Sequence, residues 1–419
     1  MLVLSAIAPL LFVQYDEPTA GLLAVKFLAK AGSLCGTVLL VWQLVLGFRV
    51  VSTLFHKDLL WLVRLHERVG MVAIPLILLH PIFITIYYAW TSRPAVWAVD
   101  PGVPFYWFVL LGLAALALLV FIFITSVFLR KRLGYGRWFA THLTTYAVLP
   151  LVFVHAMPIG MTLSQTPLKW YWVFLISVAA AVLLCRTLNL LGWRTLSHEV
   201  TQVRRLTPDV TELTMTPLET PVCPQIGQFV YLRRSKAGGQ RPFSVAGYDE
   251  RNGRIRIASQ VETSFTEALE HLQPSETIYL DGPYGVFTQD ALLTDRPLVM
   301  VAGGIGITAF LRLLEHLESQ GHRPAWLFYG NRNTEDIAYR RKLDAMEHVQ
   351  VVHVISKQPD FPGERGMITV ELIRSYVHHP LRQCEVLLCG PPVMVQKLEQ
   401  QLSQLGLPDE QIHHELFGF

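Results

Sequence analysis

The stretch RLHERVGMVAIPLILLHPIF, residues 64–83, combines an apolar run that suits a membrane with two histidines, His66 and His80. A titratable side chain that lies in hydrocarbon costs a few kcal/mol or more. Each imidazole should therefore either face a protein interior or hold a bound group. The rest of the chain decides between these two possibilities.

The composition indicates that part of the chain is embedded in a membrane. Of 419 residues, 52% are hydrophobic and 16% are charged, and the mean hydropathy is +0.38. Long apolar segments continue to about residue 192, whereas the sequence after Arg194 is typical of a soluble protein. The net charge of +3 and the absence of a long basic run give no indication of nucleic-acid binding.

Five segments are long and apolar enough to cross a bilayer core of roughly 30 Å. They cover residues 31–48, 69–90, 104–129, 138–158 and 170–191. A sixth apolar segment, residues 2–13, is short for a span and lacks the basic start of a signal peptide. The sequence therefore predicts a membrane α-helical bundle of about six spans.

Lysine and arginine are denser in the loops before residue 69 and after residue 129 than in the loops on the other side. Short loops rich in these residues usually lie in the cytoplasm. With this orientation the last span ends inside the cell. We expect a multi-pass protein of the plasma (inner) membrane whose soluble half is cytoplasmic.

Two more histidines, His142 and His155, lie thirteen residues apart in a second membrane segment, whereas His66 and His80 are fourteen apart. At 1.5 Å per residue both separations are about 20 Å along a helix axis. Matching by depth pairs His66 with His142 and His80 with His155. Histidine is a usual axial ligand of haem iron. The sequence therefore suggests two b-type haems, each held by one pair.

A different role for these histidines has to be weighed. A single histidine in a membrane helix is more often a hydrogen-bonding group or part of a proton path. Four histidines at matched depths favour ligation. One feature does not suit an ideal helix, because thirteen steps of about 100° leave His142 and His155 roughly 140° apart. A kink at Pro150, which lies between them, is a candidate explanation.

Short strands alternate with turns in residues 200–285, which predicts a small antiparallel β-barrel. Its RPFS motif offers the donors of Arg241 for a phosphate, the flat ring of Phe243 for a ring system and the hydroxyl of Ser244. An Arg-Pro pair at the start of a strand is also common without any ligand. Downstream, SFTEAL (264–269) predicts a helix whose first amides could hold a second phosphate group.

From Arg296 the pattern changes to alternating strands and helices, which is typical of an α/β Rossmann-like domain. The segment that starts there, RPLVMVAGGIGITAFLRLLEHLES, suggests a buried strand, a glycine turn and a helix. Gly304, Gly306 and Ala309 fit the pattern G-x-G-x-x-G/A, in which missing side chains let backbone amides approach a pyrophosphate. The context therefore favours nucleotide binding.

Two later strands in this half end in residues that could contact the nucleotide. The first, AWLFYGNRN (325–333), contains Arg332, which could meet a 2′-phosphate or be only a loop cation. The second, EVLLCGPPVM (385–394), contains Cys389 and Gly390, and Cys389 could instead be a packed strand-end residue. Both alternatives stay open on the sequence alone.

The motifs RPFS, SFT, DGPYG, VAGGIGIT and LLCGPP stand in the order found in ferredoxin-NADP reductase-like flavoproteins, and the preceding histidine pairs resemble the ferric reductase and NADPH oxidase superfamily. The resemblance spans essentially the whole chain. It implies FAD in the barrel, NADPH or NADH in the α/β domain and two haems on the four histidines. For FAD it implies Arg241, Pro242, Phe243, Ser244 and Thr266. For the nucleotide it implies Gly303, Gly304, Gly306, Thr308 and Cys389, to which the two strand ends add Arg332 and Gly390 as expected contacts.

The expected domains are residues 1–195 for haem, 196–292 for FAD and 293–419 for NAD(P)H. NAD(P)H would reduce FAD, and electrons would pass through two haems to an acceptor outside, either oxygen, giving superoxide, or a ferric chelate. An alternative is a membrane subunit that reduces a periplasmic redox protein or a quinone. The expected partners are membrane lipid, NAD(P)H and this acceptor, with no obligatory protein partner and no nucleic acid.

The chain ends HHELFGF, and two phenylalanines in a terminal segment suggest a buried or stacked site. We expect Phe417 to cover the core of the nucleotide domain. Related reductases place a terminal aromatic residue over the flavin, so the resemblance implies this role for Phe419. Ser244, Cys389 and Phe419 are then the residues expected nearest to hydride transfer.

Overall fold

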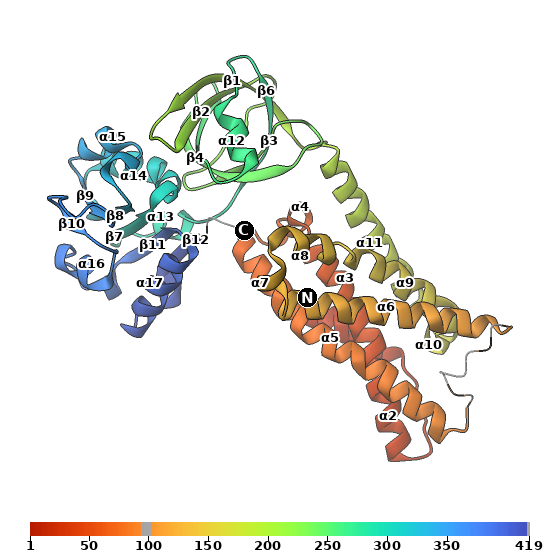
Figure 1. Cartoon of the computed structure of the whole chain (residues 1–419). Coiled ribbons are helices and arrows are strands. Elements are labelled where there is room, and N and C mark those ends of the chain that lie inside the picture. Colours follow the sequence, from red (N-terminus) through yellow and green to blue (C-terminus); the bar gives the residue numbers. More distant parts are fainter. Residues whose placement is uncertain (94, 96–99, 101, 417–419) are drawn as a thin grey trace. The chain divides into compact units, whose positions relative to one another are not determined.

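The structure is a computed structural model that describes residues 1–93, 95, 100 and 102–416. It divides into two units, Met1–Thr187 and Leu188–Phe419 (Figure 1). The first unit consists of helices, and the second contains a β-barrel and a parallel sheet. The division of the second unit into domains at residue 292 stays a prediction.

In the described residues, five helical segments are long and apolar enough to cross a membrane. The last of them, Leu168–Leu190, extends across the boundary between the two units. The apolar segment near the start forms only a short helix over Leu2–Phe12, so five spans replace the expected six. The spans are Ala20–Leu46 (α2 Ala20–Lys30, η2 Ala31–Cys35, α3 Gly36–Leu46), α5 (Leu59–Trp90), α6 (Pro104–Val127), Gly136–Ile159 (within α8 Tyr135–His142 and α9 Thr145–Ile159) and α11 (Leu168–Leu190). The short helices are α1 (Leu2–Ile7), η1 (Ala8–Phe12), α4 (Arg49–Ser52), α7 (Arg130–Leu133) and α10 (Met161–Gln165).

Helix α5 starts ten residues before the apolar run that the sequence marks as a span. Asp58 caps it, because one carboxylate oxygen accepts hydrogen bonds from the backbone amides of Leu60 at 2.8 Å and Trp61 at 3.1 Å. His66 and His80 therefore lie on one continuous helix. At 1.5 Å per residue they are about 21 Å apart along its axis.

The spans pack as two groups. Helices α2 and α3 pack against α5, and α6 packs against α9. Their shared core includes Leu34, Ala73, Phe153 and Trp172, all buried. Other large apolar side chains of these helices are exposed, as expected for surfaces that face lipid.

In the second unit, six antiparallel strands close into a barrel in the order β1-β2-β5-β4-β3-β6 (Figure 1). Inward-facing apolar residues alternate along the strands, and those of β2 and β5 have no exposed surface at Leu213, Met215, Ile255 and Ile257. The elements are β1 (Leu196–Arg205), β2 (Val210–Pro217), β3 (Phe229–Arg233), β4 (Gln240–Asp249), β5 (Arg254–Gln260), α12 (Ser264–Glu270) and β6 (Thr277–Tyr284).

The second part of this unit is a parallel sheet in the order β10-β9-β8-β7-β11-β12. The elements are α13 (Gln289–Leu292), β7 (Leu298–Gly303), η3 (Gly304–Ala309), α14 (Leu311–Gln320), β8 (Ala325–Asn331), η4 (Thr334–Asp336), α15 (Arg340–Asp344), β9 (Val349–Ile355), β10 (Glu364–Arg365), α16 (Val370–Tyr376), η5 (Leu381–Gln383), β11 (Glu385–Gly390), α17 (Pro392–Gln404), η6 (Asp409–Gln411) and β12 (Ile412–Leu416). Helix α14 covers one face, and α16 and α17 cover the other.

Strand β7 is buried along its whole length, as is typical of a central parallel strand. The strand order reverses there, because β8 lies on one side of β7 and β11 on the other. In open α/β sheets a ligand usually binds at the carboxyl ends of the strands at such a reversal. The expected combination of helical spans, antiparallel barrel and Rossmann-like sheet is confirmed.

Candidate functional site

The four membrane histidines form two pairs. The ring centroids of His66 and His142 are 6.1 Å apart with their planes at 68°. Those of His80 and His155 are 6.4 Å apart with their planes at 71°. The structure thus joins α5 to α8 through one pair and to α9 through the other.

These distances suit a metal ion between the two rings of each pair. Bonds from a metal to imidazole nitrogen are about 2.0–2.1 Å, and each nitrogen lies roughly 1 Å from its ring centre, so rings on opposite sides of one metal have centroids about 6 Å apart. The described residues contain no group of three or more His, Cys, Asp or Glu placed to hold a metal ion. Two protein ligands are sufficient for iron that a porphyrin already holds.

The ring nitrogens on the outer sides of the pairs have defined surroundings. Nδ1 of His155 is 2.7 Å from the backbone oxygen of Phe108, and Nδ1 of His80 is 3.2 Å from that of Ala29. A histidine that ligates a metal usually donates its other N–H to such an acceptor, which fixes the orientation of the ring. The His80/His155 pair therefore fits an axial-ligand set.

The other pair has different partners. Nδ1 of His142 is 3.2 Å from the hydroxyl oxygen of Ser126. Nδ1 of His66 is buried without a hydrogen-bond partner in the described structure. This pair also fits two ligands of one haem, but only one of its rings is held by a hydrogen bond at Nδ1.

Glycines allow neighbouring helices to approach the histidines closely. A Cβ atom at Gly112 of α6 would lie 2.5 Å from Nδ1 of His155, and one at Gly32 would lie 2.6 Å from the backbone nitrogen of His80. Both distances are too short for any real side chain. Sequence reasoning missed these residues, although a glycine inside a long apolar helix is the signal that marks close helix packing.

The structure accommodates the thirteen-residue spacing next to His142. Helix α8 ends there, and α9 begins at Thr145 after a turn. Tight i+3 hydrogen bonds bridge this turn, from the amide of Thr144 to Thr141 at 3.2 Å and from that of Tyr146 to Leu143 at 3.2 Å. Such turns rotate the chain by about 120° per residue rather than 100°. Pro150 instead lies inside continuous α9.

The glycine turn of the second unit lies where β7 and β11 end. A Cβ atom at Gly306 would be 2.4 Å from the backbone oxygen of Cys389, and one at Gly303 would be 2.7 Å from Pro391. Gly304 has a φ of +54°, which favours glycine, and open space at its Cβ position. The turn is therefore packed against β11 on one side and open on the other.

Three other expected nucleotide residues lie near the ends of these strands. The hydroxyl of Thr308 donates to the backbone oxygen of Ile305 at 2.9 Å and is buried. Cys389 is fully buried, and burial raises the pKa of its thiol well above the usual value, so the thiol is neutral. Arg332 is exposed just beyond β8. The glycine turn with Thr308, Cys389 and Arg332 thus lie at the same end of the parallel strands, their carboxyl ends.

The RPFS motif lies at the start of β4. Arg241 and Pro242 are exposed there, while the hydroxyl of Ser244 is buried without a hydrogen-bond partner among the described residues. Phe243 is also buried and stacks on Phe265, with ring centroids 6.4 Å apart and planes at 23°. One face of the ring predicted as a platform therefore already packs in the barrel.

The predicted phosphate helix α12 uses its first groups for its own cap. The amide of Thr266 donates to the Thr263 hydroxyl at 3.3 Å, and the Thr266 hydroxyl accepts from the amide of Glu262 at 3.0 Å. Thr266 therefore acts as part of a capping box in the described structure.

Phe417 and Phe419 lie outside the described residues. Just before them, Glu415 lies opposite Cys389 in the register of β12 and β11. Its carboxylate oxygen would be 3.8 Å from a Cβ at Gly285, in the DGPYG turn of the barrel. Sequence reasoning missed Glu415, although an acid inside the terminal HHELFGF segment was the available signal.

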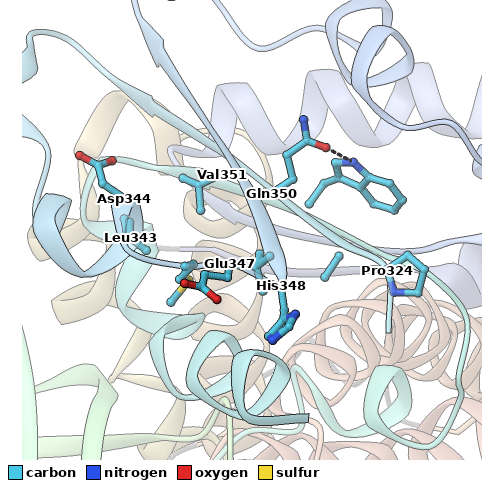
Figure 2. Close-up of a pocket in the computed structure, with 11 residues that line it drawn as sticks. Pro324, Leu343, Asp344, Glu347, His348, Gln350 and Val351 are labelled. Carbon is cyan, nitrogen blue, oxygen red and sulfur yellow. Dashed lines mark hydrogen bonds between the residues drawn. The ribbon is translucent and has the colours of Figure 1, made fainter. Parts of the chain in front are cut away.

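A hollow at the opposite end of the sheet is separate from these residues. Figure 2 shows that its lining includes Pro324, His348 and Gln350, which lie beside the starts of β8 and β9. Gln350 accepts a hydrogen bond from the indole of Trp326 at 2.8 Å. Ligands of parallel sheets bind at the carboxyl ends of strands, so this hollow is not the nucleotide site.

Two family models match the chain. Residues 32–153 match the ferric reductase like transmembrane component, and residues 300–400 match the oxidoreductase NAD-binding domain. The first match contains His66, His80 and His142 and ends two residues before His155. The second contains the glycine turn and the end of β11.

Several relatives and solved structures match about half of the chain. The reductase component of propane 2-monooxygenase from Mycolicibacterium smegmatis is 30% identical over 248 residues, which cover 55% of this chain and 70% of that protein. NADH-cytochrome b5 reductase 3 from Rattus norvegicus is 25% identical over 260 residues, which cover 53% and 84%. The solved structure of ferredoxin reductase in carbazole 1,9a-dioxygenase is 24% identical, with a TM-score of 0.48 and coverage of 54% and 69%.

The two family matches lie in the same order as the two units of the structure. The propane 2-monooxygenase reductase component matches over most of its own length. The chain belongs to the ferric reductase superfamily, as a membrane flavoprotein oxidoreductase whose ferric reductase like transmembrane component precedes a ferredoxin-NADP reductase-like half for FAD and NAD(P)H.

Proposed function

We propose that the chain carries electrons from cytoplasmic NAD(P)H through FAD and two b-type haems to an acceptor on the other side of the membrane. The observation that carries this proposal is the pair of imidazole sites, with centroid distances of 6.1 and 6.4 Å. Both distances suit one iron between two rings. Each site combines a ligand from α5 with one from α8 or α9.

The two sites provide a route across the apolar core. FAD can take a hydride and release electrons one at a time, and each haem can carry one electron. Because His66 and His80 are about 21 Å apart along α5, the two sites lie at different depths of a span. The helices fix these depths and exclude water from the route, and no acid or nucleophile of the chain is needed.

At the reductase half, Ser244 and the motif around Arg241 are the proposed FAD contacts. The buried Ser244 hydroxyl supports this assignment, because a buried polar group without a partner usually has one in the complete molecule. The glycine turn, Cys389 and Gly390 are the proposed nicotinamide-nucleotide contacts. Their support is the packing of the turn on β11 at the point where the strand order reverses.

The proposed location is the plasma membrane with the reductase half in the cytoplasm. The dense basic residues near the start of α5, Arg64 and Arg68, and those of α7, Arg130 to Arg132, support this orientation. In the described structure Arg130 of α7 lies 3.4 Å from Glu67 of α5, so these two basic segments are adjacent in the first unit. With this orientation His66 and His142 would hold the haem on the cytoplasmic side, the one nearer to the electron supply.

The test is purification of the intact protein in detergent followed by haem and flavin analysis. The expected ratio is two b-type haems and one FAD per chain, with both haems reduced on addition of NADPH. Oxygen uptake, superoxide yield and reduction of a ferric chelate are then compared in the same preparation. A protein with no haem contradicts the proposal, and haems that stay oxidised while FAD is reduced contradict the electron route.

Arg332 provides a test of nucleotide choice. Arg332 is exposed just beyond β8, and Gly330 of that strand pairs with Gly303 at the start of the glycine turn, so a 2′-phosphate of NADPH bound there would gain a charged partner. Arg332→Ala should raise the apparent KM for NADPH about ten-fold, which corresponds to one charge-assisted hydrogen bond, and leave that for NADH nearly unchanged. Arg340→Ala, which replaces an exposed arginine at the start of α15, is the control. Equal effects on both nucleotides would show that Arg332 does not contact the phosphate.

A further inference from the structure

The surroundings of His142 form a connected set of contacts that the electron route does not by itself require. Ser126 lies in the last turn of α6, and its hydroxyl oxygen is 3.2 Å from Nδ1 of His142. The indole N–H of Trp138 donates to the same oxygen at 3.3 Å. Ser126 therefore receives two donors when Nδ1 of His142 carries a proton.

Trp138 also fixes the plane of the imidazole. Its ring stacks on that of His142, with centroids 5.2 Å apart and planes at 29°. Trp138 precedes His142 by four residues on α8, so the two side chains share one face of this helix. The guanidinium of Arg130 lies over the Trp138 ring, 4.5 Å from its centroid.

We infer that Ser126 and Trp138 are positioning residues that orient His142 and set the reduction potential of the haem proposed at His66/His142. This inference rests on the proposed function. If Nε2 of His142 held the iron, Nδ1 would carry the proton and Ser126 would accept its hydrogen bond. Such an acceptor raises the basicity of the ligand, and a more basic ligand stabilises ferric iron and lowers the potential.

Trp138 acts on the potential with the opposite sign. Its N–H occupies a lone pair of the Ser126 oxygen and so weakens that oxygen as an acceptor for His142. Removing the Ser126 hydroxyl should therefore raise the potential. Replacing the indole by an aromatic ring without an N–H should lower it, because Ser126 then serves His142 alone. A purely structural role would not give two opposite shifts.

The experiment is a potentiometric titration of the two haems in the full-length protein, with haem content and low-spin electron paramagnetic resonance spectra as further readouts. Ser126→Ala should retain both haems and shift one midpoint potential upwards, whereas Trp138→Phe should shift the same potential downwards. Ser126→Thr, which keeps the hydroxyl, should restore the wild-type value. The control is Ser177→Ala, because the Ser177 hydroxyl bonds only within α11, to Val173 at 2.9 Å.

Comparison with His142→Leu and His155→Leu assigns the shifted potential to one haem. If Ser126→Ala and Trp138→Phe leave both potentials unchanged, move both haems alike, or move one in the same direction, the inference is overturned. If His142→Leu retains two haems, the proposed ligation fails and the inference fails with it. These outcomes separate a wrong ligand set from a wrong role for Ser126.

Discussion

The two histidine pairs differ in what holds their rings. Both rings of the His80/His155 pair meet backbone oxygens at Nδ1, 3.2 Å from Ala29 and 2.7 Å from Phe108. In the other pair, His142 meets a side chain, Ser126, and His66 has no partner at Nδ1 in the described structure. One site is thus built mainly from helix packing, and the other depends on the identity of side chains.

This difference has a chemical consequence for two sites that would bind the same cofactor. A backbone oxygen is present whatever residue stands at that position, so the properties of the His80/His155 site follow from the approach of α2 and α6. A hydroxyl can be removed or shared, as Trp138 shares that of Ser126. The two proposed haems can therefore differ in potential although their ligands would be identical in type.

The largest effect should come from removing a ligand. If each pair shares one iron, as proposed, His142→Leu and His155→Leu should each lower the haem content from two to one per chain and abolish electron transfer to the external acceptor. The readout is the haem-to-protein ratio of purified protein, together with NADPH-dependent acceptor reduction.

The two variants should retain different haems, which the remaining midpoint potential and spectrum distinguish. His56→Leu, at an exposed histidine outside the spans, is the control and should retain both. Full haem content in His142→Leu, or the same residual haem in both variants, would break the comparison between the pairs.

The next effect concerns the glycines beside each pair. Gly112→Ala places a Cβ 2.5 Å from His155 Nδ1, whereas Gly47→Ala places one 3.4 Å from His66 Cε1. The Cβ at Gly47 would also lie 3.0 Å from the backbone oxygen of Gln43, which needs a shift of only a few tenths of an ångström, whereas the contact at Gly112 requires the imidazole or the helix to move. Overpacking of this kind typically costs about 1–3 kcal/mol.

Gly112→Ala should therefore lose much of the His80/His155 haem and keep the other, while Gly47→Ala should keep most of both. The midpoint titration of each purified variant measures which haem is lost. Equal losses of haem in the two variants would mean that the short contact between a Cβ at residue 112 and His155 is not the cause of the loss.

The membrane half shows how far its sequence alone leads. Span lengths, the two histidine separations and the density of basic residues are local patterns, so spans and candidate ligands were predictable. The turn at Leu143 and Thr144 was not predictable, because this segment carries neither glycine nor proline. The sequence suggested a kink at Pro150 instead. The partners at Nδ1 come from other helices and depend on packing that no local pattern contains.

In the reductase half, the barrel, the sheet and the glycine turn followed from alternation and spacing. The stacking of Phe243 on Phe265 and the use of Thr266 in a cap did not, because each depends on the neighbouring element. Glu415 reaches its position opposite Cys389 only through the pairing of β12 with β11.

The smallest effect should come from a change at the proposed FAD site, which precedes both histidine pairs on the proposed electron route. Ser244 is 2% exposed, and its hydroxyl has no partner among the described residues, so Ser244→Ala removes a polar atom without creating a large cavity. If that hydroxyl contacts FAD, loss of one hydrogen bond worth about 0.5–1.5 kcal/mol should slow flavin reduction by NADPH roughly two- to ten-fold. Every electron that reaches either pair then passes this slower step. Both haems should therefore be reduced more slowly by the same factor, with unchanged midpoint potentials, in stopped-flow absorbance measurements.

Ser259→Ala is a matched control, because Ser259 is also a buried barrel serine, 3% exposed, without a described hydrogen-bond partner. A Ser244→Ala protein in which only one haem slows would show that the two pairs do not share one electron supply.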